Sequence, residues 1–353
     1  MIITGAAGFL GRRLLCAFQT DYELFAVDRR PPGATGAPEG VGIHWYQADI
    51  AAPAALRDAF NAIRGQQPIR ILLHLAGYYD FTGEPHPEYT RSNVEGMRNV
   101  LDMAPMFELT RLVFSSSVAA CAFPPPGETV NEDTPPHGVE PYSRSKRAGE
   151  ELLHAYRDRV PSNIVRLAAV FTDWCEYEPL TNFLDTWFSH RWDNRALGGR
   201  GDWAIPYIHI DDLAAFFQRV VASVDALAPL EVAQGSPNGC TTHRQLYDAA
   251  TQAFYGHARP PMMIPKPVAR LGIRMREGLG RVTGKMPFER AWMGAYIDEQ
   301  LTVDATRTHQ KLGWSPRSEL DILARVPVMV QHWKTEPQEW ARRQWIRKST
   351  QYD

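Results

Sequence analysis

A glycine-rich stretch at residues 4–11 places the strongest constraint on the fold of this chain. It reads Thr-Gly-Ala-Ala-Gly-Phe-Leu-Gly, follows the apolar run 1–3, and precedes an apolar-periodic stretch from Leu14 to Phe18. A strand, a glycine turn and a helix in this order are the context that a dinucleotide-binding loop requires. The glycines let the backbone approach a pyrophosphate at the positive N-terminus of the helix. A plain strand-to-helix turn is the alternative, but the pattern favours cofactor contacts by Gly5, Gly8, Phe9, Leu10 and Gly11.

An acidic residue stands at the tip of the second expected strand, Tyr22 to Val27. Asp28 lies seventeen residues after Gly11, where a carboxylate hydrogen-bonds the adenine ribose hydroxyls and repels a 2′-phosphate. NAD is therefore the expected cofactor. NADP is the alternative, because Arg29 and Arg30 would accommodate its extra phosphate.

Two later strands predict further contacts with the cofactor. The expected strand 43–47 leads to Asp49 and Ile50, which either contact the adenine edge or form an ordinary turn. The continuous apolar run 69–75 is typical of a buried strand in a parallel sheet. Its His74 is interpreted as a hydrogen-bonded core histidine. Small residues at its end would let the phosphoribose lie against the sheet, which assigns to the cofactor Leu75, Ala76 and Gly77.

The segment Pro-Tyr-Ser-Arg-Ser-Lys at 141–146 carries the expected catalytic pair. On a helix, Tyr142 and Lys146 stand four residues apart and share one face. The ammonium is expected to lower the phenol pKa from its reference of about 10, which would make Tyr142 a general acid or base. Upstream, the strand 111–114 ends in three serines, whose hydroxyls would polarise a carbonyl oxygen. A solvated helix face and a serine-capped turn are the ordinary alternatives.

Ordered segments across most of the chain resemble the extended short-chain dehydrogenase/reductase superfamily, and within it the NAD-dependent epimerase/dehydratase group. These segments are 4–11, Asp28, 49–50, 74–77, 93–96, 115–117, Tyr142 with Lys146, 207–213 and 312–316. The resemblance implies an α/β fold, with a Rossmann doubly wound parallel sheet of about seven strands and a smaller C-terminal substrate domain. It places the NAD(P)-binding domain at 1–170, joined by about 205–225. The substrate-binding domain and tail would be 171–204 and 226–353.

The same resemblance implies a Ser-Tyr-Lys catalytic set. Ser117 is the matching serine, because it precedes Tyr142 by 25 residues. Asn93 would support a water near Lys146, while Ser115, Tyr142 and Lys146 would also contact the cofactor. A homodimer through the two long helices that begin near Asn93 and Tyr142 is a further implication.

Three departures from the family pattern argue against a nucleotide-sugar substrate. Ala169 replaces an Asn that grips the sugar diphosphate, Ile205-Pro206 replaces an Arg-Asp pair, and 296–301 lacks an Arg-x-Gly-Asp element. A buried diphosphate without partners would be costly. The leading hypothesis is an NAD(P)-dependent oxidoreductase that interconverts an alcohol and a carbonyl on an apolar or acyl-type small molecule. The alternative is an NAD-dependent nucleotide-sugar epimerase or dehydratase, and a catalytically inactive cofactor sensor is disfavoured because Tyr142 and Lys146 are both present.

Two aromatic or basic segments have open interpretations. The loop 78–87 either lines the substrate pocket with Tyr78, Tyr79 and Phe81 or packs internally. The basic segment 262–290 has apolar residues at spacings of three and four and predicts an amphipathic helix. It is a lid, a membrane-surface contact or, preferably, a helix packed on the substrate domain with a solvated basic face. The tail from Val330, with its tryptophans, wraps on the body or forms a subunit contact.

Composition excludes several classes of protein. The formal net charge of −2 gives no reason to expect a nucleic-acid partner. The four scattered cysteines predict reduced thiols without a disulfide frame or a metal site. No secretory signal is expected, and no apolar run approaches the ~20 residues of a membrane span. A cytoplasmic location is the resulting expectation.

Overall fold

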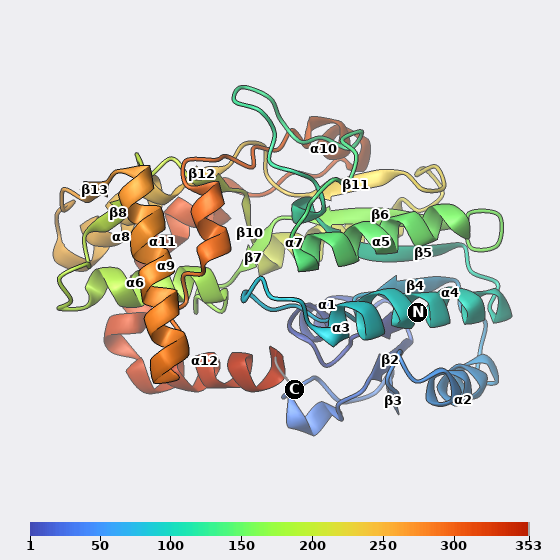
Figure 1. The fold of residues 1–353 in the computed structure, drawn as a ribbon. Helices are drawn as coiled ribbons and strands as arrows, with labels where there is room; N and C mark the ends of the chain where they lie inside the picture. Colours follow the sequence, from blue (N-terminus) through green and yellow to red (C-terminus); the bar gives the residue numbers. More distant parts are fainter. Residues whose placement is uncertain (352–353) are drawn as a thin grey trace.

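Seven parallel strands form the central sheet of the computed structural model, which describes residues 1–351, with side chains through residue 346 (Figure 1). The strand order is β11-β6-β5-β4-β1-β2-β3, the doubly wound order of dinucleotide-binding folds. The predicted fold class is therefore confirmed. The strands are β1 (Ile2–Thr4), β2 (Leu24–Asp28), β3 (Ile43–Gln47), β4 (Ile71–His74), β5 (Arg111–Ser117), β6 (Ser162–Leu167) and β11 (Val232–Gly235).

Helices cover both faces of this sheet. Side chains alternate along a strand, so Ile3 lies in the core under α1 (Phe9–Phe18) and α7 (Ile210–Ala222), whereas Ile2 lies in the opposite core. That second face is covered by α2 (Pro53–Arg64), α4 (Met97–Met103) and α5 (Pro141–Ala155). Between α3 (Pro87–Thr90) and α4, residues Arg91–Gly96 form a π-helical turn, an arrangement that is frequent at functional sites.

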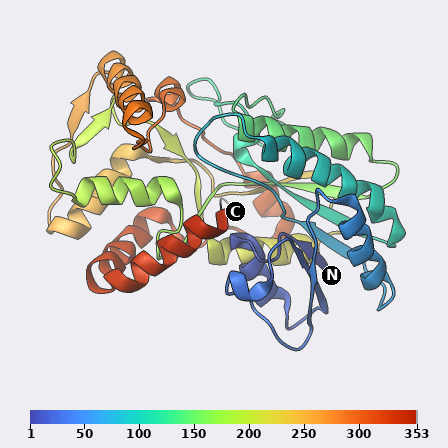
Figure 2. The same ribbon diagram turned by 60° about the horizontal axis from the view of Figure 1, so that its bottom comes forward.

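Strand β6 ends at Leu167, and β7 (Ala169–Phe171) leaves the main sheet to pair with β10 (Tyr207–His209). Most of the later elements gather to one side of the sheet, and the last helix, red in Figure 2, extends toward the blue N-terminal part. The elements on that side are α6 (Glu178–Phe188), β8 (Ala196–Gly198), β9 (Ala204–Ile205), β12 (Thr241–Thr242), α8 (His243–Tyr255), β13 (Met262–Ile264), α9 (Lys266–Thr283), α11 (Ile322–Thr335) and α12 (Pro337–Gln351). Helix α10 (Thr306–Leu312) lies beside β11 instead, and its Leu312 belongs to the core under α1 and α7 (Figure 1).

The predicted domain boundaries stay a prediction, although β11 places part of 226–353 in the main sheet. In the tail, Trp340 is buried and Trp333 packs on Phe188, while Trp345 is exposed. Within the described residues, no helix is long and apolar enough to cross a membrane.

A buried ion pair fixes α5 on the sheet. Glu150 on α5 and Arg166 on β6 form two hydrogen bonds, from Nη2 to Oε2 at 2.8 Å and from Nε to Oε1 at 3.0 Å. Ser116 on β5 donates to the same carboxylate at 2.5 Å, and Arg166 Nη1 reaches the Thr134 carbonyl at 2.7 Å. Both charged side chains are 3% exposed. Burial of each charge is tolerated because the other neutralises it.

Replacement of Glu150 by alanine should therefore destabilise the fold strongly. It leaves the Arg166 charge buried without a partner, which typically lowers the free energy of unfolding by about 3–5 kcal/mol. The neighbouring Glu151, paired with Arg147 on the surface at 2.7 Å, is the matched control, and Glu151→Ala should stay within about 1 kcal/mol. Urea unfolding measures the stability of both variants, and equal losses would contradict a structural role for the buried Glu150–Arg166 pair.

Candidate active site

A cavity of about 1170 Å³ opens where the strands of the main sheet end. It extends from the glycine loop, past the ends of β4 and β5, to α6 and α9. A second cavity of about 120 Å³ adjoins it at the ends of β2 and β3. The two share the lining residues Gly5, Gly8, Arg30, Leu75, Gly77 and Tyr78.

The glycine loop lies in close contact with the end of β4. Gly5 has a φ of +73°, and a Cβ added there would stand 2.6 Å from the backbone nitrogen of Ala76. A Cβ on Gly11 would overlap the carbonyl oxygen of Gly5. Only glycine fits these positions. The loop leads into the N-terminus of α1, and its predicted cofactor residues all line the large cavity: Gly5, Gly8, Phe9, Leu10 and Gly11.

Asp28 ends β2 beside the small cavity. Its Oδ2 accepts from the Ala7 backbone nitrogen at 3.0 Å, and its Oδ1 accepts from the Arg30 nitrogen at 2.9 Å. The carboxylate thus braces the glycine loop. The small cavity is also lined by the other residues predicted to contact the adenosine half of a cofactor, namely Arg29, Asp49, Ile50, Leu75, Ala76 and Gly77.

Asp49 and His74, two titratable residues of this region, are both hydrogen-bonded within the protein. Asp49 accepts from the Ala51 nitrogen at 2.9 Å and from Arg91 Nη1 at 2.8 Å, so it forms a turn while it lines the cavity. His74 Nδ1 lies 2.8 Å from the Thr4 hydroxyl, and burial lowers its pKa to about 3. Its interpretation as a neutral core histidine is confirmed.

The structure brings Ser117, Tyr142 and Lys146 together in the large cavity. Ser117 ends β5, Tyr142 lies in the first turn of α5, and Lys146 follows one turn later. Lys146 Nζ donates to the Ser115 carbonyl oxygen at 2.8 Å. The Ser117 Oγ accepts from the Ala119 nitrogen at 3.1 Å, and the Ser117 hydroxyl is also hydrogen-bonded to the Tyr142 phenol.

The expected fall in the pKa of Tyr142 is wrong for this structure. Burial raises the pKa of Tyr142 to about 12, and the hydrogen bond with Ser117 only partly opposes this rise. The Lys146 ammonium lies 5.9 Å from the centre of the phenol ring and is held by the Ser115 carbonyl. Burial also lowers the pKa of Lys146 to about 8, against the attraction of Glu150. Desolvation therefore outweighs the pairing inferred from the four-residue spacing.

Asn93 lies in the π-helical turn Arg91–Gly96, beside Ser145 of α5. Its Oδ1 accepts from the Tyr78 nitrogen at 2.6 Å, and its Nδ2 donates to the Tyr78 carbonyl at 2.9 Å and to the Ser145 hydroxyl at 2.9 Å. These bonds tie the end of β4 to α5. A water held by Asn93 near Lys146 stays a prediction, since the amide already holds the backbone of Tyr78.

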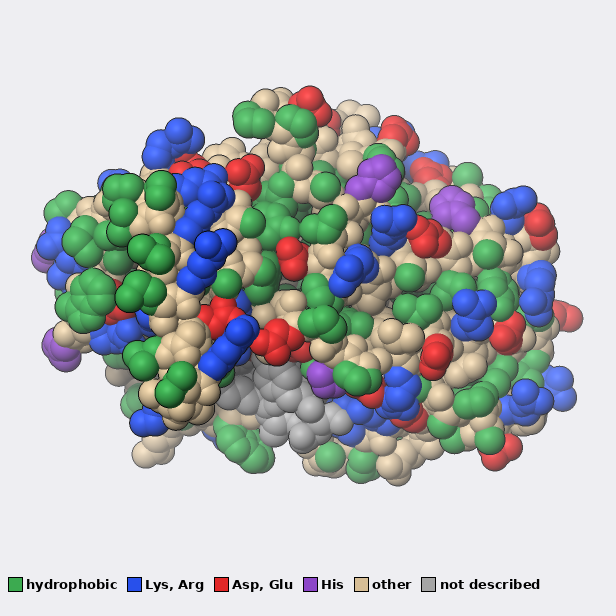
Figure 3. Space-filling view, viewed as in Figure 1, with side chains coloured by type: hydrophobic (Ala, Val, Ile, Leu, Met, Phe, Trp, Pro, Cys, Tyr) green, Lys and Arg blue, Asp and Glu red, His purple; other side chains and the backbone are tan. Residues whose placement is uncertain are grey.

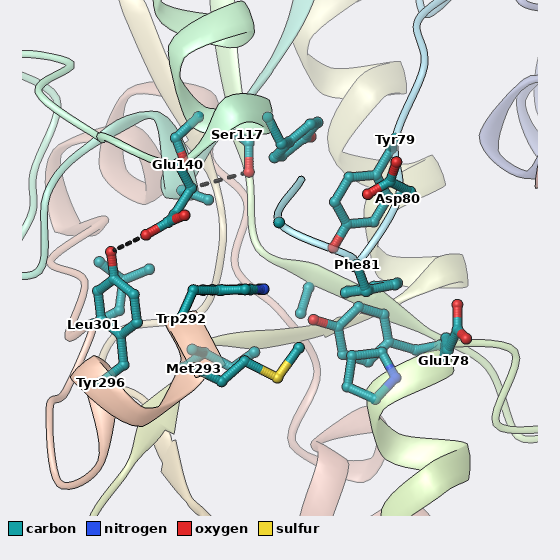
Figure 4. A pocket seen from close by; sticks show the side chains of 18 of the residues that line it. Tyr79, Asp80, Phe81, Ser117, Glu140, Glu178, Trp292, Met293, Tyr296 and Leu301 are labelled. Atoms are coloured by element: carbon teal, nitrogen blue, oxygen red, sulfur yellow. Dashed lines mark hydrogen bonds between the residues drawn. The ribbon is translucent and has the colours of Figure 1, made fainter. Parts of the chain in front are cut away.

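The far half of the cavity is largely aromatic (Figure 4). Tyr79 packs on Tyr142 with ring centroids 4.3 Å apart, and Phe81 packs on Tyr177 and Phe288. Opposite them, Trp292 Nε1 donates to the Thr82 carbonyl oxygen at 2.9 Å. Of the two interpretations of the loop 78–87, the structure favours the one in which Tyr78, Tyr79 and Phe81 line the pocket.

Several lining residues carried no signal in the sequence. Trp292 and Met293 come from the 3₁₀ helix Ala291–Tyr296, and the Tyr296 phenol donates to Glu140 at 2.9 Å. Arg12 also lines the cavity, beside the glycine loop. The contacts of Trp292 and Tyr296 join segments far apart in the chain, so no local pattern predicts them.

The positions that depart from the nucleotide-sugar pattern border the same cavity. Ala169, Ile205 and Pro206 all line it, and none carries a charge or a side-chain hydrogen-bond donor. Seven carboxylates and four Lys or Arg also line the cavity. The carboxylates belong to Asp80, Glu140, Glu176, Glu178, Asp193, Glu289 and Glu299, and the cations to Arg12, Arg30, Lys146 and Arg276.

The preferred interpretation of the basic segment is wrong about its apolar residues. Helix α9 turns them outward, and Leu271, Met275 and Leu279 are 59%, 66% and 64% exposed. The arginines of the helix are exposed as predicted, although some also bond to the body of the protein, as Arg270 does through the Gly294 carbonyl at 2.8 Å. The acidic pair Asp211–Asp212 lies at the N-terminus of α7, and Asp212 is paired with Arg317.

Comparisons with known proteins agree with this geometry. Residues 1–233 match the NAD dependent epimerase/dehydratase family. Two relatives are a NAD-dependent glucose-6-phosphate dehydrogenase of Haloferax volcanii, 27% identical over 47% of this chain and 66% of the relative, and a uronate dehydrogenase of Agrobacterium fabrum, 28% identical over 54% and 67%. The crystal structure of a UDP-glucose 4-epimerase from Thermotoga maritima is similar in fold, with a TM-score of 0.72, 17% identity, and 96% and 99% of the two chains covered. The chain therefore belongs to the NAD-dependent epimerase/dehydratase family.

Proposed function

We propose that this protein is an NAD-dependent oxidoreductase that interconverts an alcohol and a carbonyl on an apolar substrate that is not a nucleotide sugar. The observation that carries the proposal is the composition of the cavity beyond Ser117 and Tyr142. Aromatic side chains dominate it, and the positions where family members hold a diphosphate are Ala169, Ile205 and Pro206. A ligand pocket of this kind suits an apolar molecule with one or two polar groups.

The cofactor side of the cavity fits NAD. The glycines at 5, 8 and 11 leave backbone rather than side chains at the turns of the loop, which leaves room for a pyrophosphate. Asp28 accepts from Ala7 of the loop through Oδ2 and from the Arg30 nitrogen through Oδ1, and it still borders the small cavity, where its charge would disfavour a 2′-phosphate. Gly77 is also confined, since a Cβ there would stand 3.2 Å from Asn93 Oδ1 and 3.6 Å from Lys146 Nζ.

In the proposed reduction, Tyr142 donates the proton and Ser117 holds the reacting oxygen. NAD held by the glycine loop would supply the hydride to the carbonyl carbon, while the Tyr142 phenol gives its proton to the oxygen, which yields the alcohol. The Ser117 hydroxyl donates a hydrogen bond to that oxygen and polarises the carbonyl. Lys146 is positioned by the Ser115 carbonyl, and its charge favours the phenolate that remains. Oxidation runs through the same groups in reverse.

An epimerase or dehydratase is the second candidate. The fold similarity to the Thermotoga maritima UDP-glucose 4-epimerase extends over 96% of this chain, and such an enzyme would use the same catalytic residues. The two candidates differ in net redox change. An oxidoreductase consumes or releases reduced cofactor in proportion to product, whereas an epimerase leaves the cofactor unchanged overall.

Removal of the Tyr142 hydroxyl should abolish turnover and spare cofactor binding. Tyr142→Phe removes the proton donor, a loss of about 10²–10⁴-fold in kcat, while NADH binding measured by fluorescence should be retained. Tyr156→Phe is the matched control, because Tyr156 caps the same helix and its phenol bonds Asp102 at 2.7 Å. Full activity in Tyr142→Phe would end this mechanism.

The pH dependence of the two directions should differ. With a pKa of about 12, the Tyr142 phenol is protonated throughout pH 6–9, so it is ready to donate a proton in reduction. Oxidation requires the deprotonated form, whose fraction rises about tenfold per pH unit below the pKa. In single-turnover experiments, the rate of reduction should be independent of pH over this range, whereas the rate of oxidation should rise with pH. An oxidation rate that is constant over this range would contradict the assigned base.

Cofactor preference should depend on the charge of Asp28. The unchanged protein should bind NADH at least about tenfold more tightly than NADPH, because a carboxylate repels the 2′-phosphate. Asp28→Asn removes that charge and should reduce the preference for NADH over NADPH. Arg30 is close enough to pair with the added phosphate. Asp21→Asn, an exposed site, is the control. An unchanged ratio in Asp28→Asn would refute this role.

A further inference from the structure

Helix α9 presents a continuous apolar stripe to solvent. Val268, Leu271, Met275, Leu279 and Val282 recur at spacings of three and four, and they are 58%, 59%, 66%, 64% and 86% exposed. Residues at these spacings share one helix face, so the stripe runs about 21 Å along the helix. A surface helix normally turns such a face toward the core. An apolar row left in solvent marks an interaction surface.

Polar contacts hold the helix in this inverted orientation. Lys266 pairs with Glu299 at 3.3 Å, and Arg276 reaches Asp193 at 3.5 Å. On the inner face, the buried Glu277 accepts from Arg281 at 2.6 Å. Glu277 also accepts from the Ala291 backbone nitrogen at 2.6 Å. The charged side chains therefore hold the helix against the protein, and the apolar face is left exposed to solvent.

Further exposed apolar side chains adjoin the stripe. Met262 and Met263, 41% and 37% exposed, lie on β13 directly before the helix, and Met286 follows it at 38%. Trp192 is 83% exposed, and its neighbour Asp193 is the partner of Arg276 in the middle of α9. Tryptophan is enriched where a protein meets the boundary of a bilayer. In Figure 3, hydrophobic side chains gather over α9 with Lys and Arg along their side.

We propose that this outer face of α9 docks on the surface of an anionic lipid bilayer. The helix contains five Lys or Arg and a single acidic residue, Glu277, which is buried. Arg274 and Lys285 are exposed beside the stripe, and neither has an acidic partner among the described side chains. Basic flanks around an apolar face match an interface of anionic headgroups over acyl chains.

The charge pattern disfavours a second copy of the chain as the occupant. A two-fold contact places the same patch on both subunits, so it would bring the basic flanks of one α9 against those of the other. Like charges at an interface are unfavourable, whereas anionic lipid neutralises them. The inner side of α9 lines the large cavity through Ala269, Gly272 and Ile273, so docking would bring the cavity wall to the membrane. Docking of α9 on a bilayer is compatible with either candidate reaction.

Vesicle co-sedimentation of the full chain tests the docking surface. The protein should sediment with vesicles of phosphatidylcholine and phosphatidylserine and stay in solution with phosphatidylcholine alone. Combined Leu271→Glu, Met275→Glu and Leu279→Glu should weaken the binding by about tenfold or more, because charge is placed on the inserted face. Arg274→Glu with Lys285→Glu should weaken it as added salt does. Val41→Glu, at a fully exposed valine in a distant loop, is the matched control and should bind normally.

Retained NADH binding and an unchanged unfolding transition confirm that each variant is folded. Sedimentation velocity is measured on the same samples. Binding to anionic vesicles that the triple variant loses supports the proposal. Absence of vesicle binding by the unchanged protein, or equal binding by the triple variant, overturns it. A triple variant that turns a dimer into a monomer, with no vesicle binding before or after, would assign the face to a second copy and equally overturn it.

Discussion

The position of α5 depends on one buried pair of charges. Glu150 and Arg166 neutralise each other between the helix and β6, and Ser116 on the adjacent strand donates a further hydrogen bond to the carboxylate. Because α5 also carries Tyr142 and Lys146, the same contact sets how the phenol faces Ser117 on β5. A buried pair of this kind is weak as a source of stability but intolerant of losing either partner. The relative positions of Ser117, Tyr142 and Lys146 thus depend on the Glu150–Arg166 pair, which lies one helical turn beyond Lys146.

Burial has two opposite consequences in the site. It holds Tyr142 protonated and reduces the cost of removing the proton from Lys146. A buried phenol is well suited to give a proton to a carbonyl oxygen, and the aromatic wall formed by Tyr79 and Phe81 keeps the surroundings apolar. The same apolar wall carries the proposal that the substrate is not a nucleotide sugar. The proposed substrate class and the proposed proton chemistry both depend on the low polarity of the substrate side of the cavity.

Local patterns in the sequence predict the parts of the structure that depend on neighbours in the chain. The glycine loop, the strand before Asp28 and the helix that begins at Pro141 are of this kind, since each is specified by residues within one or two turns. Long-range packing decides the rest. The contact of Trp292 with Thr82 joins segments about two hundred residues apart, and the pKa of Tyr142 depends on burial that spacing does not encode. The amphipathic pattern of α9 predicts the helix correctly, but it does not tell which face meets the protein.

The central claim, net oxidoreduction of an apolar substrate, is tested most directly with reduced NAD that carries deuterium in its transferable position. The enzyme would be supplied with this cofactor and a panel of apolar ketones and aldehydes. A parallel reaction would contain UDP-glucose and oxidised NAD. Mass spectrometry of the released products follows the label. The account predicts deuterium in a released alcohol, in equal amount to the cofactor oxidised. Product from UDP-glucose with no net change in the cofactor, and no turnover of the apolar carbonyls, would contradict it.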